Sequence, residues 1–318
     1  MHADEVPTDV ALVRRLLAAQ FPHWAELPVE PFPSTGTVNA VYRLGDDMTV
    51  RLPRIEGGVE DLAKENRWLP WLAPQLPVPV PVVLLGAGTP AEGYPWPWSV
   101  YRRLDGAHPE AGRLSQPGAL AADLADFVMA LRRIDPVDGP PAYRGGALCD
   151  QDGETRAALA RLREPAELGE PRGIIDIDID TEAAAAAWDV SLRAPEWDGP
   201  PVWLHSDLMP GNLLLDSADG GRLSGVIDFG TVGLGEPASD LIPAWNLLPA
   251  GVRDGFRAAL DADDATWARG RGWALSMALI QLPYYLRTNP ALAANAHHVI
   301  TEVLADHATD HATSRRLF

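Results

Sequence analysis

The sequence predicts an α+β fold with two lobes, a small lobe around an antiparallel sheet and a larger, mainly helical lobe. Short strand-like runs fill most of the first hundred residues of the 318-residue chain, whereas the pattern after Gly106 has the spacing of helices. Hydrophobic residues make up 47% of the chain, which is enough for a sizeable core. We expect the first lobe at 1–103 and the second at 104–318.

The elements of the small lobe follow from local patterns. Thr8 is the predicted N-cap of a first helix, which ends at Pro22. In a strand at 48–52, apolar side chains alternate with Thr49 and Arg51, so these two side chains should face away from the apolar side of the sheet. The other elements expected in this lobe are strands at 41–44, 82–85 and 98–104 and a helix at 60–72.

The large lobe reads as helical with one interruption. A strand-like island contains two apolar runs on either side of a turn at 217–221, which predicts a hairpin. The last eighty or so residues are helix-rich. The elements expected are helices at 117–134 and 182–192 and strands at 202–204, 213–215 and 226–227.

Composition limits the partners and the compartment. Acidic residues exceed basic ones by 18, and such a surface repels nucleic acid and anionic membranes. Cys149 is the only cysteine, so no intramolecular disulfide is possible and a cytoplasmic location is expected. The most apolar stretch, 273–286, is short and contains Pro283, which indicates a buried helix instead of a membrane span. The sequence does not indicate an oligomeric state.

The strand-like island carries side chains suited to phosphoryl transfer. This chemistry needs an aligned hydroxyl, metal ions on the phosphates and positive charge near the phosphate oxygens. Asp207 and Asn212 follow the first strand, and the hairpin should bring Asp228 back beside Asn212. One carboxylate would then lie near a substrate hydroxyl, while an amide and a second carboxylate are the hard oxygen ligands that Mg²⁺ prefers.

These residues resemble the kinase signatures H-x-D-x-x-x-x-N and D-F-G, here His205 to Asn212 and Asp228 to Gly230. The closer similarity is to the aminoglycoside and macrolide phosphotransferase family, in which G-D/E-P-x-x-D-L follows the metal aspartate, as 235–241 does here. Protein kinases usually carry Arg after the His and Lys two residues after the catalytic Asp. Ser206 and Met209 stand at these positions, so a protein substrate is disfavoured.

The resemblance implies a protein-kinase-like fold and assigns roles to five residues. Asp207 would accept or orient the proton of the substrate hydroxyl, and Asn212 and Asp228 would hold Mg²⁺. His205 would brace the catalytic loop, and Asp240 would anchor it through backbone hydrogen bonds.

The resemblance also implies where a nucleotide binds. Ser34 and Gly36 would belong to the loop over the phosphates, although a hairpin turn is an equally good interpretation of a segment with one glycine. The strand 99–104 resembles the hinge between lobes, where backbone groups around Tyr101 to Arg103 would hydrogen-bond a purine. ATP and GTP are not distinguished by such contacts.

Arg51 occupies the strand position where kinases usually carry lysine. The only lysine of the chain, Lys64, lies on the expected helix and cannot replace it in the strand. Arginine also binds phosphate, and Glu65 is its expected partner from the helix. The alternative is an ordinary surface arginine.

On the substrate side, Asp176, Asp178 and Asp180 are interpreted either as an acidic wall for a cationic antibiotic or, more simply, as a strand edge and helix caps. Three aromatic side chains could line a cleft or belong to the core, namely Trp245, Tyr284 and Tyr285.

The predicted function is transfer of the γ-phosphoryl group of ATP or GTP to a hydroxyl of a small molecule. An antibiotic of the aminoglycoside, macrolide or nucleoside type is expected, which would give resistance by inactivation. Two alternatives stay open: a kinase of a primary metabolite such as a choline-like or amino alcohol, and a catalytically idle nucleotide-binding module.

Overall fold

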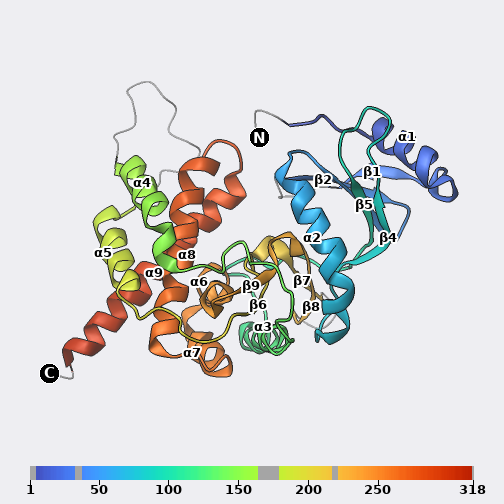
Figure 1. The fold of residues 1–318 in the computed structure, drawn as a ribbon. Coiled ribbons are helices and arrows are strands. Elements are labelled where there is room, and N and C mark those ends of the chain that lie inside the picture. The colour runs from blue at the N-terminus through green and yellow to red at the C-terminus, as the bar shows by residue number, and fades with distance from the viewer. Residues whose placement is uncertain (1–4, 33–37, 164–178, 217–220, 317–318) are drawn as a thin grey trace.

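In the computed structural model the chain forms two lobes, a strand-rich one and a mainly helical one (Figure 1). The structure describes residues 5–32, 38–163, 179–216 and 221–316. Within these residues no helix is both long and apolar enough to cross a membrane. The α+β class and the two-lobed layout predicted from the sequence are confirmed.

The small lobe contains a five-stranded antiparallel sheet with the strand order β1-β2-β3-β5-β4. Helix α1 covers its outer side, and helix α2 lies on the side that faces the larger lobe (Figure 1). The elements are α1 (Val10–Gln20), β1 (Val29–Pro31), β2 (Asn39–Leu44), β3 (Met48–Pro53), α2 (Gly57–Leu72), β4 (Val82–Gly88) and β5 (Trp98–Arg102).

The large lobe surrounds two short antiparallel pairs, β6 with β9 and β7 with β8. Its strands are β6 (Val202–Leu204), β7 (Leu213–Leu215), β8 (Leu223–Val226) and β9 (Gly233–Gly235). Its helices are α3 (Pro117–Arg132), α4 (Asp152–Arg163), α5 (Thr181–Leu192), α6 (Pro243–Asn246), α7 (Ala250–Ala259), α8 (Asp264–Tyr285) and α9 (Pro290–Arg316). Single 3₁₀ turns that matter for the site are η4 (Pro210–Asn212), η5 (Phe229–Thr231) and η6 (Pro237–Leu241).

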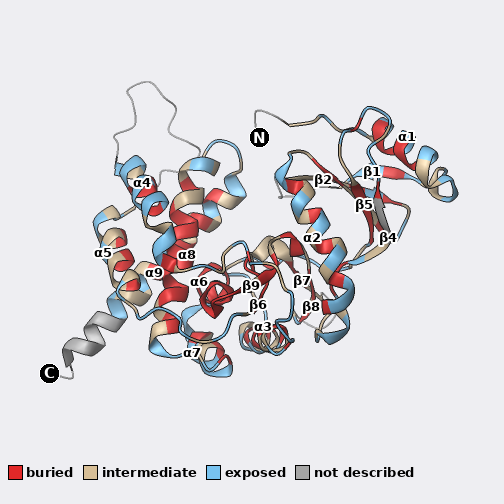
Figure 2. Cartoon of the chain, in the orientation of Figure 1, coloured by how far each residue is buried: buried red, intermediate tan, exposed pale blue. Residues whose placement is uncertain are grey.

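The buried apolar residues form two clusters (Figure 2). The smaller cluster lies between α1 and the sheet. The larger one fills the helical lobe and extends into the small lobe, because it includes Leu62 and Leu69 of α2 and Tyr101 of β5. Helix α2 therefore packs on the large lobe through its buried apolar residues.

Local sequence signals located most of these elements. The helix expected at 60–72 begins earlier, at Gly57, the strand expected at 98–104 ends at Arg102, and the strand expected at 226–227 is Leu223–Val226. The cap of the first helix also differs. The N-cap of α1 is Asp9, whose carboxylate accepts the N–H of Leu12 at 2.7 Å. Thr8, the predicted cap, instead accepts a hydrogen bond from the Tyr42 hydroxyl at 3.0 Å. Both residues are good caps, and the tertiary contact to Tyr42 decides between them.

Candidate active site

The loop that follows β6 is fixed by a buried carboxylate. Asp240, in η6, is fully buried and accepts hydrogen bonds from the backbone N–H groups of His205 at 2.9 Å and Ser206 at 2.7 Å. The anchoring expected of Asp240 is thus confirmed. Burial raises the pKa of Asp240, while the two N–H donors and the charge of Arg132 favour its ionised form.

Ser206 adopts a left-handed backbone conformation, with φ of 64°. This costs a non-glycine residue of the order of 1 kcal/mol and persists only where the surroundings enforce it. Here the Ser206 hydroxyl donates to the carbonyl of Thr231, and the Thr231 hydroxyl donates to the carbonyl of His205. The loop before Asp207 is therefore held from both sides.

Asp207 has both carboxylate oxygens hydrogen-bonded. Its Oδ2 accepts from Nδ2 of Asn212 at 3.0 Å, and its Oδ1 accepts from Nη1 of Arg144 at 3.0 Å. Its backbone N–H donates to Nδ1 of His205 at 3.3 Å. The side chain is 22% exposed, so an acceptor molecule can reach a carboxylate whose orientation is already set.

The hairpin β7–β8 returns the chain to the end of this loop. The N–H of Ile227 donates to the carbonyl of Asn212 at 2.9 Å, which brings Asp228 beside Asn212. Asp228 is also left-handed, with φ and ψ of 66°, and its side chain is 44% exposed. Ser206 and Asp228 are thus both left-handed non-glycine residues, one directly before Asp207 and one beside Asn212, and such strain is typical of functional sites.

Arg51 connects the small lobe to this site. Its Nη2 donates to Asp228 at 2.8 Å, and its Nη1 lies 2.9 and 3.0 Å from the two oxygens of Glu65. Glu65 is fully buried and also accepts from the hydroxyl of Tyr101 at 2.6 Å and the N–H of Phe229 at 2.8 Å. Burial and the Glu65 carboxylate raise the pKa of Tyr101, so its phenol stays a donor. The expected pairing of Arg51 with Glu65 is present.

A further carboxylate, Asp61, lies one helical turn before Glu65 on α2. Burial, followed by the charge of Asp228, raises the pKa of Asp61 to about 6. A side chain on Gly230 would approach the Cβ of Asp61 to 2.6 Å, so glycine is required for this close packing of α2 on η5. The sequence gives no motif for Asp61.

The donor set beside Asp207 fits a hard divalent cation. Among the described residues no group of three or more acidic, histidine or cysteine side chains is arranged to hold a metal. Mg²⁺ does not need one, since it is held by one or two protein oxygens together with substrate phosphates and water. Nδ2 of Asn212 donates to Asp207, so Oδ1 of the same amide points away from Asp207. Arg51 contacts Asp228 through Oδ1. Each side chain thus has an oxygen that could serve as a metal ligand.

The strand expected to form the hinge is β5, and one of its expected purine contacts is occupied within the protein. The N–H of Arg103 donates to the carbonyl of Asp47 at 2.7 Å, and its guanidinium binds the carbonyl of Asp46. Arg103 therefore extends the contact of β5 with the β2–β3 turn, and this N–H is not available to a purine. Tyr101 lies in β5 between two neighbouring strands, opposite Thr49 of β3 on one side and Val83 of β4 on the other. Of the described backbone N–H groups, that of Leu104 is the first after β5 that has no partner.

Some of the residues predicted to bind the nucleotide or the substrate lie outside the described part of the chain. Ser34 and Gly36, expected over the phosphates, lie outside them, as do Asp176 and Asp178. Asp180 is the N-cap of α5 and accepts the N–H of Ala183 at 2.9 Å, as the simpler interpretation requires.

The two tyrosines named as cleft or core side chains lie at the end of α8. Tyr284 is 49% exposed and meets the ring of Tyr285 edge-on at 4.8 Å. Tyr284 therefore does not belong to the core.

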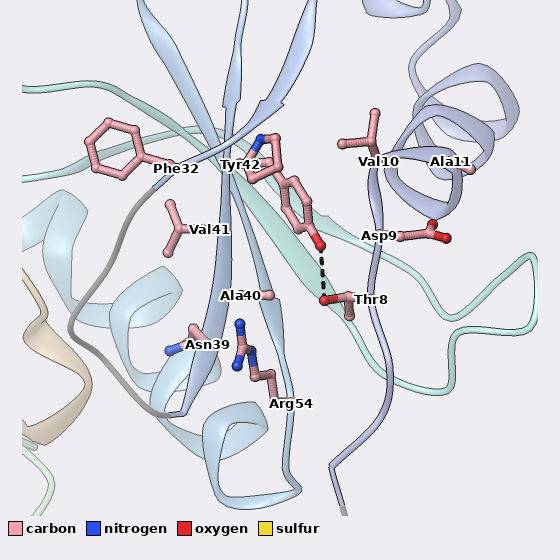
Figure 3. Close-up of a pocket in the computed structure, with 11 residues that line it drawn as sticks. Thr8, Asp9, Val10, Ala11, Phe32, Asn39, Ala40, Val41, Tyr42 and Arg54 are labelled. Carbon is pink, nitrogen blue, oxygen red and sulfur yellow. Dashed lines mark hydrogen bonds between the residues drawn. The ribbon is translucent and has the colours of Figure 1, made fainter. Parts of the chain in front are cut away.

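A cavity of about 540 Å³ lies elsewhere, on the outer part of the small lobe (Figure 3). Its lining includes Thr8, Phe32, Asn39, Tyr42 and Arg54, and the Tyr42 hydroxyl points across it to Thr8 (Figure 3). No carboxylate of the catalytic loop lines it. This cavity is therefore separate from Asp207, Asn212 and Asp228.

Arg144 is the residue that sequence reasoning missed. It lies 63 positions before Asp207, between α3 and α4, in a segment without a recognisable motif. Only the adjacent Gly145 and Gly146 mark this segment as a place of close backbone packing.

Comparison with known proteins agrees with this geometry. The sequence model of the phosphotransferase enzyme family matches residues 29–273. No curated protein sequence matches the chain. Among solved structures, the GDP complex of wild-type aminoglycoside 2'-phosphotransferase-IIIa is similar, with a TM-score of 0.66 at 20% identity, over 94% of this chain and 100% of that one.

Two other structures show the same fold. The apoenzyme of the macrolide 2'-phosphotransferase MphH from Brachybacterium faecium has a TM-score of 0.57 at 22% identity, over 92% of this chain and 98% of that one. A ternary complex of a further aminoglycoside phosphotransferase with streptomycin and ATP has a TM-score of 0.55 at 17% identity, over 86% and 91% of the two chains.

Proposed function

The chain belongs to the phosphotransferase enzyme family, and from this we propose that it moves the γ-phosphoryl group of ATP or GTP to a hydroxyl of a sugar-bearing antibiotic. The lobes of the proposed enzyme are residues 1–103, which bind the nucleotide, and 104–318, which carry the catalytic loop and the acceptor site. Inactivation of the antibiotic would give resistance.

One observation carries the proposal: the carboxylate of Asp207 is oriented by two donors and lies beside Asn212 and Asp228. Asp207 would accept the hydrogen bond of the attacking hydroxyl, align its oxygen with the phosphorus and take its proton as the bond forms. A bound Mg²⁺ would neutralise charge on the phosphate oxygens, and Asn212 and Asp228 would hold it. His205 fixes Asp207 through the backbone N–H of that residue.

The small lobe would supply the nucleotide contacts. Arg51 has a fixed position because Glu65 and Asp228 hold it from two sides, and its side chain is 14% exposed. It would replace the usual lysine as the cation on the phosphates. Ser34 and Gly36 remain proposed contacts to the phosphates, and the free N–H of Leu104 is a better donor to a purine than the occupied N–H of Arg103.

The acceptor class rests on the similar structures. Aminoglycoside and macrolide phosphotransferases share this fold, and among them one holds streptomycin with ATP and one holds GDP. Both antibiotic classes carry sugar hydroxyls, and we propose an acceptor of that kind. A soluble cytoplasmic enzyme would meet such a molecule after it enters the cell.

Transfer of labelled γ-phosphate tests the proposal directly. The protein is incubated with γ-labelled ATP or GTP and Mg²⁺, with macrolides, aminoglycosides and nucleoside antibiotics as separate acceptors and with choline-like alcohols as a comparison. We expect label in at least one antibiotic. Label in the simple alcohols alone would favour a metabolic kinase. Nucleotide binding without transfer to any acceptor or to water would favour the idle module and contradict the proposal.

A further inference from the structure

The segment that carries Arg144 is built into the catalytic lobe by backbone hydrogen bonds. It runs beside η5 and β9, where the N–H of Tyr143 donates to the carbonyl of Thr231 at 3.1 Å. The N–H of Ala142 donates to Leu234, and that of Glu236 to the carbonyl of Gly145, both at 3.0 Å. The backbone of Arg144 is thus held on each side by residues that follow Asp228.

Glycines allow the two segments to approach this closely. A Cβ on Gly235 would lie 2.3 Å from the Cα of Gly145, and a Cβ on Gly145 would lie 2.9 Å from the carbonyl oxygen of Leu234. These distances exclude any side chain, since the obstructing atoms are backbone. The position of residue 144 relative to the catalytic loop is therefore fixed by packing and not by the side chain of Arg144 itself.

From this fixed position the guanidinium of Arg144 reaches the catalytic loop. Its Nη1 donates to the carbonyl of Ser206 at 3.1 Å and to Oδ1 of Asp207 at 3.0 Å. The ring of Tyr143, which is 71% exposed, lies 4.9 Å from the Arg144 guanidinium carbon and covers it. Arg144 itself is only 19% exposed. An ion pair at this depth keeps its geometry better than a surface pair does.

We propose that Arg144 is a positioning residue for phosphoryl transfer, which sets the rotamer of Asp207 so that its carboxylate meets the acceptor hydroxyl in line with the γ-phosphate. The inference rests on the proposed function. Without Arg144, Oδ1 of Asp207 loses its only described donor, and Asn212 alone cannot fix the rotation of the carboxylate about its Cβ–Cγ bond.

The role differs from that of the Arg51 pair. Arg51 contacts Glu65 and Asp228, so its loss acts on the nucleotide side of the site. Arg144 contacts Asp207 and the loop before it, on the acceptor side. Loss of Arg144 should therefore lower kcat while the affinity for nucleotide stays the same.

The test compares Arg144→Ala and Arg144→Lys with the parent protein, using labelled γ-phosphate transfer to whichever acceptor the parent labels best. We expect Arg144→Ala to lower kcat roughly 100-fold, the usual effect of a small misplacement of a catalytic group. Arg144→Lys should keep more activity than Arg144→Ala, because an ammonium can still donate to Asp207. The Kd for nucleotide should stay within about 2-fold of the parent value in both, since neither variant changes the nucleotide contacts.

Rescue by free guanidinium separates positioning from a structural role. Added guanidinium ion should raise the transfer rate of Arg144→Ala at least about 10-fold, because it can occupy the vacated place beside Asp207, and it should not raise that of the parent. Arg156→Ala is the matched control. Arg156 pairs with two aspartates, Asp152 and Asp189, in the same lobe but away from the site, so its loss should leave transfer unchanged.

Each outcome decides the inference. Parental kcat in Arg144→Ala, or a loss that guanidinium does not restore in a folded variant, would overturn it while leaving the proposed function intact. Should Arg144→Ala not fold, Arg144→Gln takes its place in the same comparison. A parent protein that transfers no phosphate would overturn the proposed function and this inference with it.

Discussion

The guanidinium of Arg51 holds the fully buried carboxylate of Glu65, with Nη1 at 2.9 and 3.0 Å from its two oxygens. The same guanidinium reaches Asp228 of the large lobe through Nη2. One side chain of β3 thereby connects a helix of the small lobe with the residue proposed to hold Mg²⁺. The sequence has arginine here where kinases usually have lysine, and the structure shows that arginine makes both contacts at once.

Lysine at position 51 should support function, and an uncharged side chain should not. Arg51→Lys keeps one ammonium for Glu65 and the phosphates but loses the second contact to Asp228, so we expect the KM for nucleotide to rise no more than about 10-fold. Arg51→Met leaves Glu65 buried without its cation, which costs about 3 kcal/mol of unfolding free energy and removes most transfer activity. Urea unfolding and labelled transfer measure both effects, and equal activity of Arg51→Met and Arg51→Lys would contradict the assigned role.

The buried acceptor Glu65 should tolerate no donor in its place. Nη1 of Arg51 donates to both of its oxygens, and Phe229 N–H and the Tyr101 hydroxyl donate to one each, so the –NH₂ of Glu65→Gln must face the Arg51 guanidinium in either orientation. We expect a loss of about 3 kcal/mol of unfolding free energy in urea. Tyr101→Phe removes a single hydrogen bond to a charged group and should lose less, about 2 kcal/mol. A larger loss of unfolding free energy in Tyr101→Phe than in Glu65→Gln would show that Tyr101 and not Glu65 is the centre of this network.

Asp61 should make stability depend on pH. Its pKa of about 6 in the folded protein exceeds the ordinary 3.8, so the folded state binds more protons and stability falls as pH rises from about 4 to about 6. Asp61→Asn should therefore be more stable than the parent at pH 7.5, by about 1 kcal/mol once solvent screening at this half-buried site is allowed for, and equal to it at pH 4. Thermal unfolding of both proteins without nucleotide, at pH 7.5 and at pH 4, measures this difference in stability. Asp254→Asn, at an exposed helical position, is the control, and a gain for Asp61→Asn that is the same at both pH values would refute the cause given.

Asp240 should be essential to the catalytic loop as a carboxylate. In Asp240→Asn the amide N–H₂ must face the N–H of His205 or Ser206, and one buried donor loses its acceptor. We expect a loss of about 2–3 kcal/mol of unfolding free energy together with a lower kcat. The neighbouring Ser239 is buried with a hydroxyl that has no partner, so Ser239→Ala should cost nothing and serves as the control. A stable, active Asp240→Asn would mean that the loop is held by other contacts.

The sequence predicted those parts of the site that are coded locally. Asp207, Asn212 and Asp228 lie on one strand–loop–hairpin unit, whose turn residues and short apolar runs bring them together with little help from the rest of the chain. Arg51 and Glu65 were found through the resemblance to kinases, in which a strand cation pairs with a helix carboxylate, while alternation along β3 only set Arg51 on the face away from the apolar side chains.

The remaining features depend on tertiary packing that no local pattern encodes. Arg144 reaches Asp207 across 63 positions, through glycine contacts between two segments without regular structure of their own. The purine contact expected around Tyr101 to Arg103 stays a prediction, because backbone groups leave no side-chain signal; the structure adds that the β2–β3 turn occupies the N–H of Arg103. The start of α1 was misplaced by one residue, since Thr8 and Asp9 are equally good caps until Tyr42 is in place.

The role of Asp207 is tested most directly by measuring γ-phosphate transfer and nucleotide affinity on the same preparation of Asp207→Ala. Removal of a group that orients and deprotonates the hydroxyl should lower transfer by about 10³-fold or more, while the Kd for the magnesium nucleotide changes less than about 3-fold. Transfer at the parental rate, with or without tighter binding, would contradict the assignment of this site.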